Sequence, residues 1–274
     1  GLLYWLLLFS LLVIAFLARD VLIPCNISGY NTLELDTTKM AVEWKRKTAE
    51  DIEEKVLFSL IADEQTSHRN GTRMNVDDLR KGSAALFLPE IQLNEEGTYQ
   101  CVVTVTPDKA EATTTVELVA QPVVTLSPAE VTLERGQEIT LTCAVKNFYP
   151  RSIEVYWEKY SKLTQHQSVS AADICTEASV ENSDGTFSVT SKLRLLAFSE
   201  NDGHTYSCIV KHKSFTVLSV FSAILTVKEK SCFCGNILQS YTGPGDMPCT
   251  QFIFVILLQL KTISIFCSVP QNVF

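Results

Sequence analysis

Alternation of apolar and polar residues recurs through the middle of this chain and predicts an all-β protein. Residues 21–27, 99–105 and 141–145 place apolar side chains at nearly every second position. Because strand side chains point alternately to opposite faces, this period predicts half-buried strands. Two apolar stretches, residues 1–18 and 252–269, lack the alternation and stand near the two ends of the chain. The strand pattern therefore belongs to the part between them.

An eight-residue motif occurs twice within that part. Residues 94–101 read Asn-Glu-Glu-Gly-Thr-Tyr-Gln-Cys, and residues 201–208 read Asn-Asp-Gly-His-Thr-Tyr-Ser-Cys. Tyr two positions before Cys puts both side chains on one strand face, where the Cys meets a cysteine of the opposite sheet. The Tyr hydroxyl pins the preceding corner, and Tyr99 and Tyr206 are the predicted corner residues. This motif opens strand F of an immunoglobulin sandwich, so two such sandwiches are predicted.

Cysteine and tryptophan spacing predicts the type of each sandwich. The expected disulfides and the core tryptophans beside them are Cys25–Cys101 with Trp44 and Cys143–Cys208 with Trp157. The first cysteine pair is 76 residues apart, enough for a variable-type domain over residues 20–120. The second pair is 65 residues apart, which fits a seven-stranded constant-type domain over residues 121–228. Nine cysteines in such a framework indicate an oxidising compartment.

The N-terminal apolar stretch, residues 1–18, is predicted to be a signal peptide, with a membrane anchor as the alternative. Only residues 19–24 separate this stretch from Cys25. A variable-type domain uses about twenty residues there for strand A, so the sequence predicts that strand A is missing or replaced.

The C-terminal part is predicted to be a stalk over residues 229–251 and a marginal transmembrane segment over residues 252–269. Lys261 interrupts that segment, and a lysine at the membrane centre costs about 2.5–3.5 kcal/mol on insertion scales. A lipid-linked ending is an alternative that Lys261 disfavours equally. Four further cysteines lie in this part and are interpreted as membrane-proximal or interchain thiols: Cys232, Cys234, Cys249 and Cys267. Cys175 has no predicted partner and is expected to be a buried thiol.

Charge and motifs bear on the classes of function. A net charge of −8 with no lysine or arginine run disfavours nucleic-acid binding, which needs dense cationic contacts to phosphate. Neither a nucleophile elbow, a zinc-binding helix motif nor a phosphate-binding glycine loop is present in the sequence. Residues 51–54 and 95–96 are interpreted as solvated loop charge, and His212 as structural. We therefore expect no enzyme, no cofactor, no metal site and no small-molecule substrate.

Residues 82–109 carry a resemblance to a known family. The run from Gly82 to Cys101, continued by Val-Val-Thr-Val-Thr-Pro-Asp-Lys, resembles the costimulatory-ligand and butyrophilin branch of the immunoglobulin superfamily. Residues 184–191 and the Trp157-Glu-Lys segment fit this branch too. The resemblance implies a membrane glycoprotein with extracellular domains, engaged by an activating receptor on natural killer cells. A secreted form, a homophilic adhesion molecule, another immune co-receptor ligand and an incomplete, poorly folding paralogue are the alternatives.

The same resemblance implies where the receptor binds. Its candidate contacts lie in the loop between strands F and G: Thr106, Pro107, Asp108 and Lys109. A weaker second patch is residues 61–64. Strand G is expected to follow this loop over residues 113–119.

Two sequons predict glycosylation if the chain is secreted. These are Asn26-Ile27-Ser28 and Asn70-Gly71-Thr72. Asn26 directly follows a buried cysteine, so strand alternation turns its side chain outward, as a glycan requires.

Overall fold

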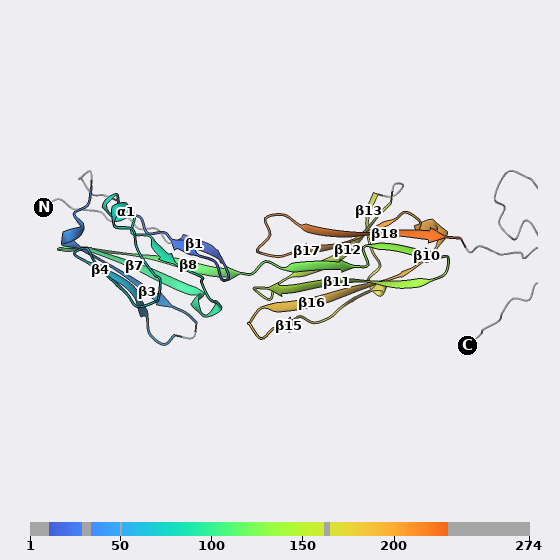
Figure 1. Ribbon diagram of the computed structural model, residues 1–274, viewed down its shortest axis with the longest axis horizontal. Helices are drawn as coiled ribbons and strands as arrows, with labels where there is room; N and C mark the ends of the chain where they lie inside the picture. Colours follow the sequence, from blue (N-terminus) through green and yellow to red (C-terminus); the bar gives the residue numbers. More distant parts are fainter. Residues whose placement is uncertain (1–10, 29–33, 50, 162–164, 230–274) are drawn as a thin grey trace, which may run out of the picture. The chain divides into compact units, whose positions relative to one another are not determined.

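The protein is described by a computed structural model over residues 11–28, 34–49, 51–161 and 165–229. This part consists mainly of strands arranged as two β-sandwiches, each with its own hydrophobic core (Figure 1). The predicted fold class is therefore confirmed. The first ten residues, and the predicted stalk and apolar segment from residue 230 onward, lie outside the described residues.

The first sandwich packs a six-stranded sheet, in the order β1-β8-β7-β3-β4-β5, against the pair β2-β6. Its strands are β1 (Leu11–Phe16), β2 (Val21–Ile23), β3 (Met40–Lys47), β4 (Lys55–Ile61), β5 (Glu64–Ser67), β6 (Leu86–Leu88), β7 (Gly97–Val105) and β8 (Asp108–Val119). Short helical turns are η1 (Thr37–Lys39), α1 (Val76–Arg80) and η2 (Leu93–Glu95). β4 and β5 take the places of the two strands that a variable-type sandwich adds to the large sheet.

The core of the first sandwich forms around the predicted disulfide. Cys25 and Cys101 are bonded, with their Cα atoms 6.5 Å apart. Trp44 is fully buried beside them, and its indole Nε1 donates a hydrogen bond to the carbonyl of Ala84 at 3.0 Å. Because the indole nitrogen is satisfied, its burial carries no unpaired-donor penalty. Tyr99 is also fully buried, and its hydroxyl donates to the carbonyl of Glu95 at 2.8 Å, which is the predicted corner contact.

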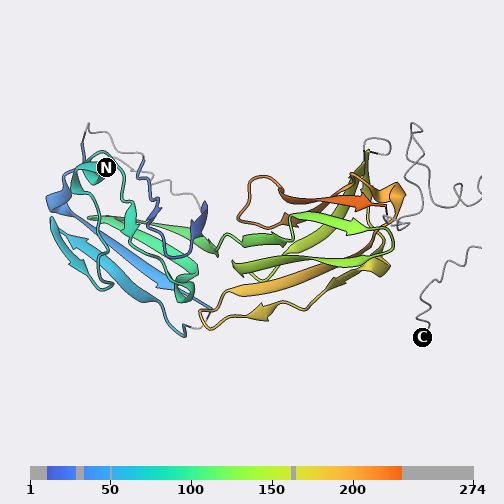
Figure 2. The ribbon, with the colours of Figure 1, turned by 45° about the vertical axis from the view of Figure 1, so that its right-hand side comes forward.

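Strand A of the first sandwich is present, contrary to the sequence-based prediction. β1 lies beside β8 (Figure 1 and Figure 2). The pairing is parallel, with Val13 opposite Val116 and Ala15 opposite Leu118. Ala15 is buried, whereas Ile14 is 47% exposed. Residues 11–16 therefore belong to the sandwich rather than to a segment that precedes it. β1 also covers the edge of β8, which the alternative of an incomplete domain expected to be open.

The second sandwich consists of two five-stranded sheets. One has the order β10-β18-β17-β12-β13, and the other has the order β14-β16-β11-β9 with β15 also paired to β16. Its strands are β9 (Val123–Ser127), β10 (Glu130–Glu134), β11 (Glu138–Phe148), β12 (Glu154–Ser161), β13 (Gln165–Ser168), β14 (Ile174–Thr176), β15 (Val180–Glu181), β16 (Phe187–Leu196), β17 (Thr205–Lys211) and β18 (Ser219–Lys228). Short helical turns are η3 (Ala171–Asp173) and η4 (Ser199–Asn201). Seven of these strands form the predicted constant-type framework, and β10, β13 and β15 are short additions.

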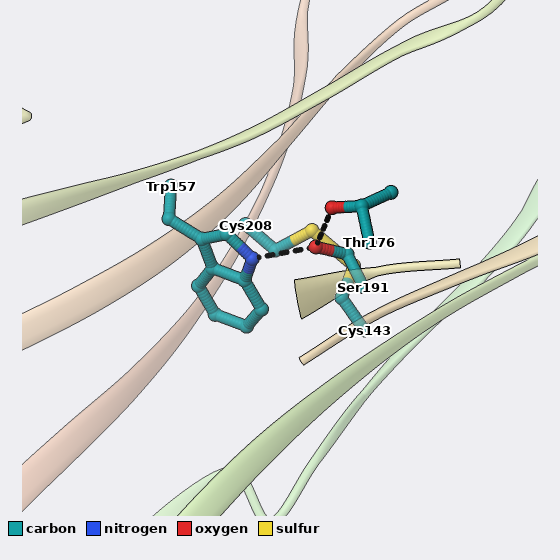
Figure 3. Close-up of a disulfide and its surroundings, with 5 residues drawn as sticks. All are labelled: Cys143, Trp157, Thr176, Ser191 and Cys208. Carbon is teal, nitrogen blue, oxygen red and sulfur yellow. Dashed lines mark hydrogen bonds between the residues drawn. A yellow bond between two sulfur atoms is a disulfide. The ribbon is translucent and has the colours of Figure 1, made fainter. Parts of the chain in front are cut away.

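The second core repeats the arrangement of the first with different hydrogen bonds. Figure 3 shows the Cys143–Cys208 disulfide beside Trp157. Here the indole Nε1 donates to the hydroxyl of Ser191 at 2.9 Å, and that hydroxyl also lies 2.8 Å from the hydroxyl of Thr176 (Figure 3). Ser191 is fully buried, so the indole and Thr176 supply the partners that its hydroxyl needs there.

Candidate functional site

The predicted loop between strands F and G is a tight hairpin turn. β7 ends at Val105 and β8 begins at Asp108, and these two residues pair across the strands. Thr106 and Pro107 alone form the connection, and both are exposed. Strand G therefore begins at Asp108, five residues before the predicted start at Thr113. Two of the four candidate residues are turn residues and two are strand residues.

The two strand residues lie on opposite faces of the sheet. Asp108 pairs with Val105, which packs partly against the core, so its side chain shares the inward face at the end of the sandwich. Lys109 pairs with Thr104 on the outward face. The side chain of Lys109 is 56% exposed. Of these two residues, Lys109 is the one presented on the front of the sheet.

The second predicted patch is also a hairpin turn. β4 and β5 are joined by Ala62 and Asp63, whose φ angles are 48° and 71°. Positive φ at both central residues is the geometry of the two-residue turns that match the twist of antiparallel strands. The turn leaves Ile61 at the end of β4 with 63% of its surface exposed. A large apolar side chain is thus exposed at the end of β4.

Strand register brings the two patches onto one line across the sheet. Lys109 pairs with Thr104, Thr104 with Ala41, and Ala41 with Ile61. We call these four residues, from β8, β7, β3 and β4, the front row. Neighbouring strands are about 4.8 Å apart, so the row extends about 14 Å across the outward face. An ammonium group stands at one end and an exposed aliphatic side chain at the other.

The charges beside the front row are already paired. The Lys109 ammonium lies 2.5 Å from Glu111, and Gln100 donates to the same carboxylate at 3.0 Å. Lys45 and Glu43 form a second pair at 2.8 Å. The hydrogen bond from Lys109 lowers the pKa of Glu111, and the bond to Glu43 raises the pKa of Lys45. The outward face is therefore polar but nearly balanced in charge around a few apolar side chains.

Sequence reasoning missed the middle of the front row. Thr104 and Ala41 were not predicted as site residues, although a signal for them exists. Val103 and Val105 point inward on β7, so Thr104 must point outward. Register between β3 and β7 could not be read from the alternation alone, because one residue of slip would have paired Thr104 with a different neighbour.

Of the carboxylates interpreted as solvated loop charge, Glu95 is buried and Asp51 is half-buried. Glu95 is 6% exposed and accepts hydrogen bonds at 2.8 Å from both Nε and Nη2 of Arg69. Arg46 adds a further contact at 3.2 Å. The side chain of Asp51 is 6% exposed and is bonded to Lys55 and Thr48, which together lower its pKa to about 2. These groups are structural, and the interpretation as solvated charge is wrong for both.

The other residues that the sequence predicted to have structural or glycosylation roles lie in both sandwiches. Tyr206 occupies the second corner position and is buried. His212 is buried as expected, with Nδ1 2.8 Å from the Ser214 hydroxyl and Nε2 3.2 Å from the Pro150 carbonyl. Asn26 and Asn70, the two sequon residues, are both exposed.

Five cysteines are not part of the two disulfides: Cys175, which the structure describes, and four in the C-terminal part, which it does not. Cys175 is a free and exposed thiol on β14, so its prediction as a buried residue is wrong. Cys175 pairs with Lys192 on the outward face of the sheet, whereas the neighbouring Ile174 pairs with the buried Leu193, and this alternation explains the exposure. The four cysteines of the C-terminal part lie outside the described residues: Cys232, Cys234, Cys249 and Cys267.

Within the described ranges, no three His, Cys, Asp or Glu side chains are grouped so that they could hold a metal ion. In that same part of the chain, no helix is long and apolar enough to cross a membrane.

Two family models match the two sandwiches. The Immunoglobulin V-set domain matches residues 13–120, and the Immunoglobulin C1-set domain matches residues 123–215. The chain belongs to the immunoglobulin superfamily. The V-set match begins within β1, in agreement with the strand that the structure places there. The front row accordingly lies on the V-set domain.

Curated relatives cover both domains. Human Natural cytotoxicity triggering receptor 3 ligand 1 is 36% identical over 195 residues, which are 71% of this chain and 42% of that protein. The CD276 antigen homolog of Xenopus laevis is 26% identical over 203 residues, which are 72% of this chain and 61% of that protein. The chain thus spans about two fifths and three fifths of the length of these relatives.

Solved structures show the same two-domain fold. Bovine butyrophilin matches with a TM-score of 0.55 at 15% identity, covering 79% of this chain and 97% of that chain. A chain from the crystal structure of ICOS in complex with ICOS-L matches with a TM-score of 0.52 at 19% identity, covering 78% of this chain and 99% of that chain. At these identities the likeness is one of fold.

Proposed function

We propose that this chain is a cell-surface ligand whose V-set domain binds an activating receptor on natural killer cells. The receptor proposed is natural cytotoxicity triggering receptor 3, because the human relative at 36% identity is named as a ligand of that receptor. The mechanism is adhesion between two cells, with no chemical step. The observation that carries the proposal is the front row, which aligns both predicted patches on one outward face.

The composition of this face suits recognition of a protein. Ile61 supplies an exposed aliphatic anchor at one end, whereas Val102, on the same face of β7, is buried and supports the surface from beneath. Lys109 and its paired carboxylate form the polar border. Protein interfaces combine an apolar centre that excludes water with a polar rim that sets orientation, and a few central side chains carry most of the binding energy.

Asp108 is compatible with this proposal although it is a carboxylate. Its carboxylate stands where an apolar residue is expected in the resembling ligands, and a carboxylate in a desolvated contact would weaken binding. The register places its side chain on the face opposite to Lys109. We therefore propose that Lys109, Ile61 and the exposed turn residues Thr106 and Pro107 make the contacts.

The direct test is binding of soluble natural cytotoxicity triggering receptor 3 to cells that display the full chain. We expect saturable binding, with Lys109→Glu and Ile61→Asp each lowering the affinity about tenfold or more, which corresponds to about 1.4 kcal/mol. Lys146→Glu is the matched control, since it reverses an exposed lysine of the C1-set domain. Its affinity should equal that of the unmodified chain at equal display, measured with an epitope tag.

Two outcomes would overturn parts of the proposal separately. Absence of binding at tens of micromolar receptor rejects this receptor as the partner. Binding that is unchanged by both substitutions keeps the receptor but removes the front row from the contact.

A further inference from the structure

A groove lies on the outer face of the small sheet of the V-set domain, away from the front row. It has a volume of about 390 Å³ and is lined by residues of β2, β6 and the segment from Arg73 to Asp78. Its lining combines apolar side chains with a cation, a carboxylate and amide and hydroxyl groups. Such a mixture binds a ligand that has both apolar faces and many hydrogen-bonding groups.

The apolar part of the groove is open to solvent. Leu22 is 61% exposed and lies opposite Phe87 in the pairing of β2 with β6. The guanidinium of Arg73 stands 3.6 Å from the centre of the Phe87 ring, a cation–π contact that fixes the ring at the groove wall. Leu22 and this stack form an ordered apolar surface open to solvent.

Asn26 stands on the same face at the end of the groove. Ile23, Cys25 and Ile27 point into the core, so the residues between them point outward. Asn26 forms an isolated bridge with Ser83, and Ser83 lines the groove. Asn26 is four positions beyond Leu22 in extended chain, a distance of about 13 Å along the surface. Two linked sugar rings attached at Asn26 have the length to reach the apolar surface.

We propose that Asn26 carries an N-linked glycan whose first N-acetylglucosamine residues lie in this groove. In the attachment step, the side-chain nitrogen of Asn26 forms a bond to C1 of the first sugar of a lipid-pyrophosphate-linked oligosaccharide. The bond between C1 and the pyrophosphate oxygen breaks, the lipid pyrophosphate leaves, and the amide loses one proton. Asn26-Ile27-Ser28 supplies the sequon that this transfer requires.

The groove offers partners for both sides of the sugar. The apolar face of a pyranose ring covers Leu22 and the Arg73–Phe87 stack, which removes their apolar surface from water. Hydroxyl and acetamido groups meet Asp78 and Ser83. Because the sugar is tethered at Asn26, its local concentration at the groove is high, and weak contacts suffice to hold it there.

The second sequon provides a natural contrast. Asn70 is exposed but is not part of the groove lining. Asn70 therefore serves as the comparison site, since a glycan there starts from a residue outside the groove. Comparing the glycans at Asn26 and Asn70 distinguishes a specific contact in the groove from the general effect of attaching a sugar to a folded domain.

The test uses the full chain produced in mammalian cells with mannosidases inhibited, so that its glycans stay sensitive to endoglycosidase H. Mass spectrometry of peptides measures occupancy at Asn26. Endoglycosidase H then cuts between the first two N-acetylglucosamines, so that only the first stays on Asn26 and the second ring, which reaches Leu22, is lost. We expect the form with the intact glycan to melt about 4 °C or more above the single-sugar form in the V-set transition. Amides of residues 83–88 should also exchange more slowly with the intact glycan.

Leu22→Ser is the variant that tests the contact, because it alters an exposed side chain and leaves the core intact. In this variant the difference between the intact-glycan and single-sugar forms should vanish. In Asn26→Gln, and independently in Ser28→Ala, trimming at Asn70 should change neither melting nor exchange at residues 83–88. An unmodified Asn26 overturns the proposal. An occupied Asn26 whose sugar has the same effect in the unmodified chain and in the Leu22→Ser variant overturns it as well.

Discussion

At the scale of single residues, Glu95 organises one corner of the V-set domain. Its carboxylate accepts from Arg69, Arg46 and the backbone amide of Gln92, while its own carbonyl accepts the hydroxyl of Tyr99. Burial alone would raise the pKa of this carboxyl, but the hydrogen bonds from Arg69 and Gln92 outweigh it and hold the pKa below 4.5. The stability that Glu95 contributes is therefore complete above pH 4.5 and is lost as the pH falls through its lowered pKa.

Removing the main partner of Glu95 should be costly. Arg69→Ala leaves a buried carboxylate with only part of its partners, and we expect the free energy of unfolding of the V-set domain to fall by about 3 kcal/mol. Arg80→Ala is the control, because Arg80 pairs with Asp77 on the surface and such pairs contribute about 0–1 kcal/mol. Urea unfolding of the two variants measures the difference. Equal losses in both would contradict a structural role for the buried pair.

At the scale of elements, β1 covers the edge of β8 and becomes the outer strand of the large sheet of the V-set domain. Its alternate side chains differ sharply, with Ala15 buried against the core and Ile14 exposed. The strand pairs in parallel with β8, so its hydrogen bonds supply partners for backbone groups that would otherwise face solvent on that edge.

Two neighbouring substitutions test this strand. Ala15→Asp places an unpaired carboxylate in the core, and we expect it to destabilise the V-set domain by about 3 kcal/mol. Ile14→Asp puts the same group on the exposed face, with an expected change within about 0.5 kcal/mol. Thermal or urea unfolding of both variants provides the comparison. If the two changes are equally harmless, residues 11–16 do not pack as β1.

Local spacing predicted the parts of the fold that repeat within a strand or between bonded cysteines. The partners of Cys25 and Cys143, the buried Trp44 and the Tyr99 corner all follow from fixed distances along the chain. β1 did not, because a uniformly apolar stretch such as residues 11–16 has no alternation to read, and its partner lies about 100 residues away.

The candidate site also has a part that local sequence predicted and a part that it did not. Lys109 and residues 61–64 could be singled out because their segments resemble those of known ligands. Their alignment in the front row depends on three strand pairings between residues far apart in sequence. The buried state of Glu95 likewise required Arg69 to arrive from another part of the chain, which a local charge pattern does not reveal.

At the scale of the whole molecule, the V-set and C1-set domains have separate cores, each centred on one disulfide. The Cys143–Cys208 bond closes a loop of 65 residues. In the chain-entropy model, such a cross-link stabilises the folded state by about 4 kcal/mol through the unfolded chain, and it acts only on the domain that contains it.

Loss of that disulfide should therefore affect one domain. We expect the double variant Cys143→Ala, Cys208→Ala to lose about 2–5 kcal/mol in the C1-set domain. The V-set domain should keep its stability within about 0.5 kcal/mol. Hydrogen exchange followed by mass spectrometry resolves peptides from each domain and measures both values in one sample. A parallel loss of protection in the two domains would show that they unfold as a single unit.

The parallel pairing of β1 with β8 also sets an order of events during synthesis. Leu11 leaves the ribosome about 100 residues before its partner Thr114. At a synthesis rate of about 5–20 residues per second, the apolar segment that forms β1 is exposed for roughly 5–20 seconds before β8 has been synthesised. Within the described residues, β1 therefore cannot dock until β8, the last strand of its domain, has emerged, and its apolar side chains stay uncovered during that interval.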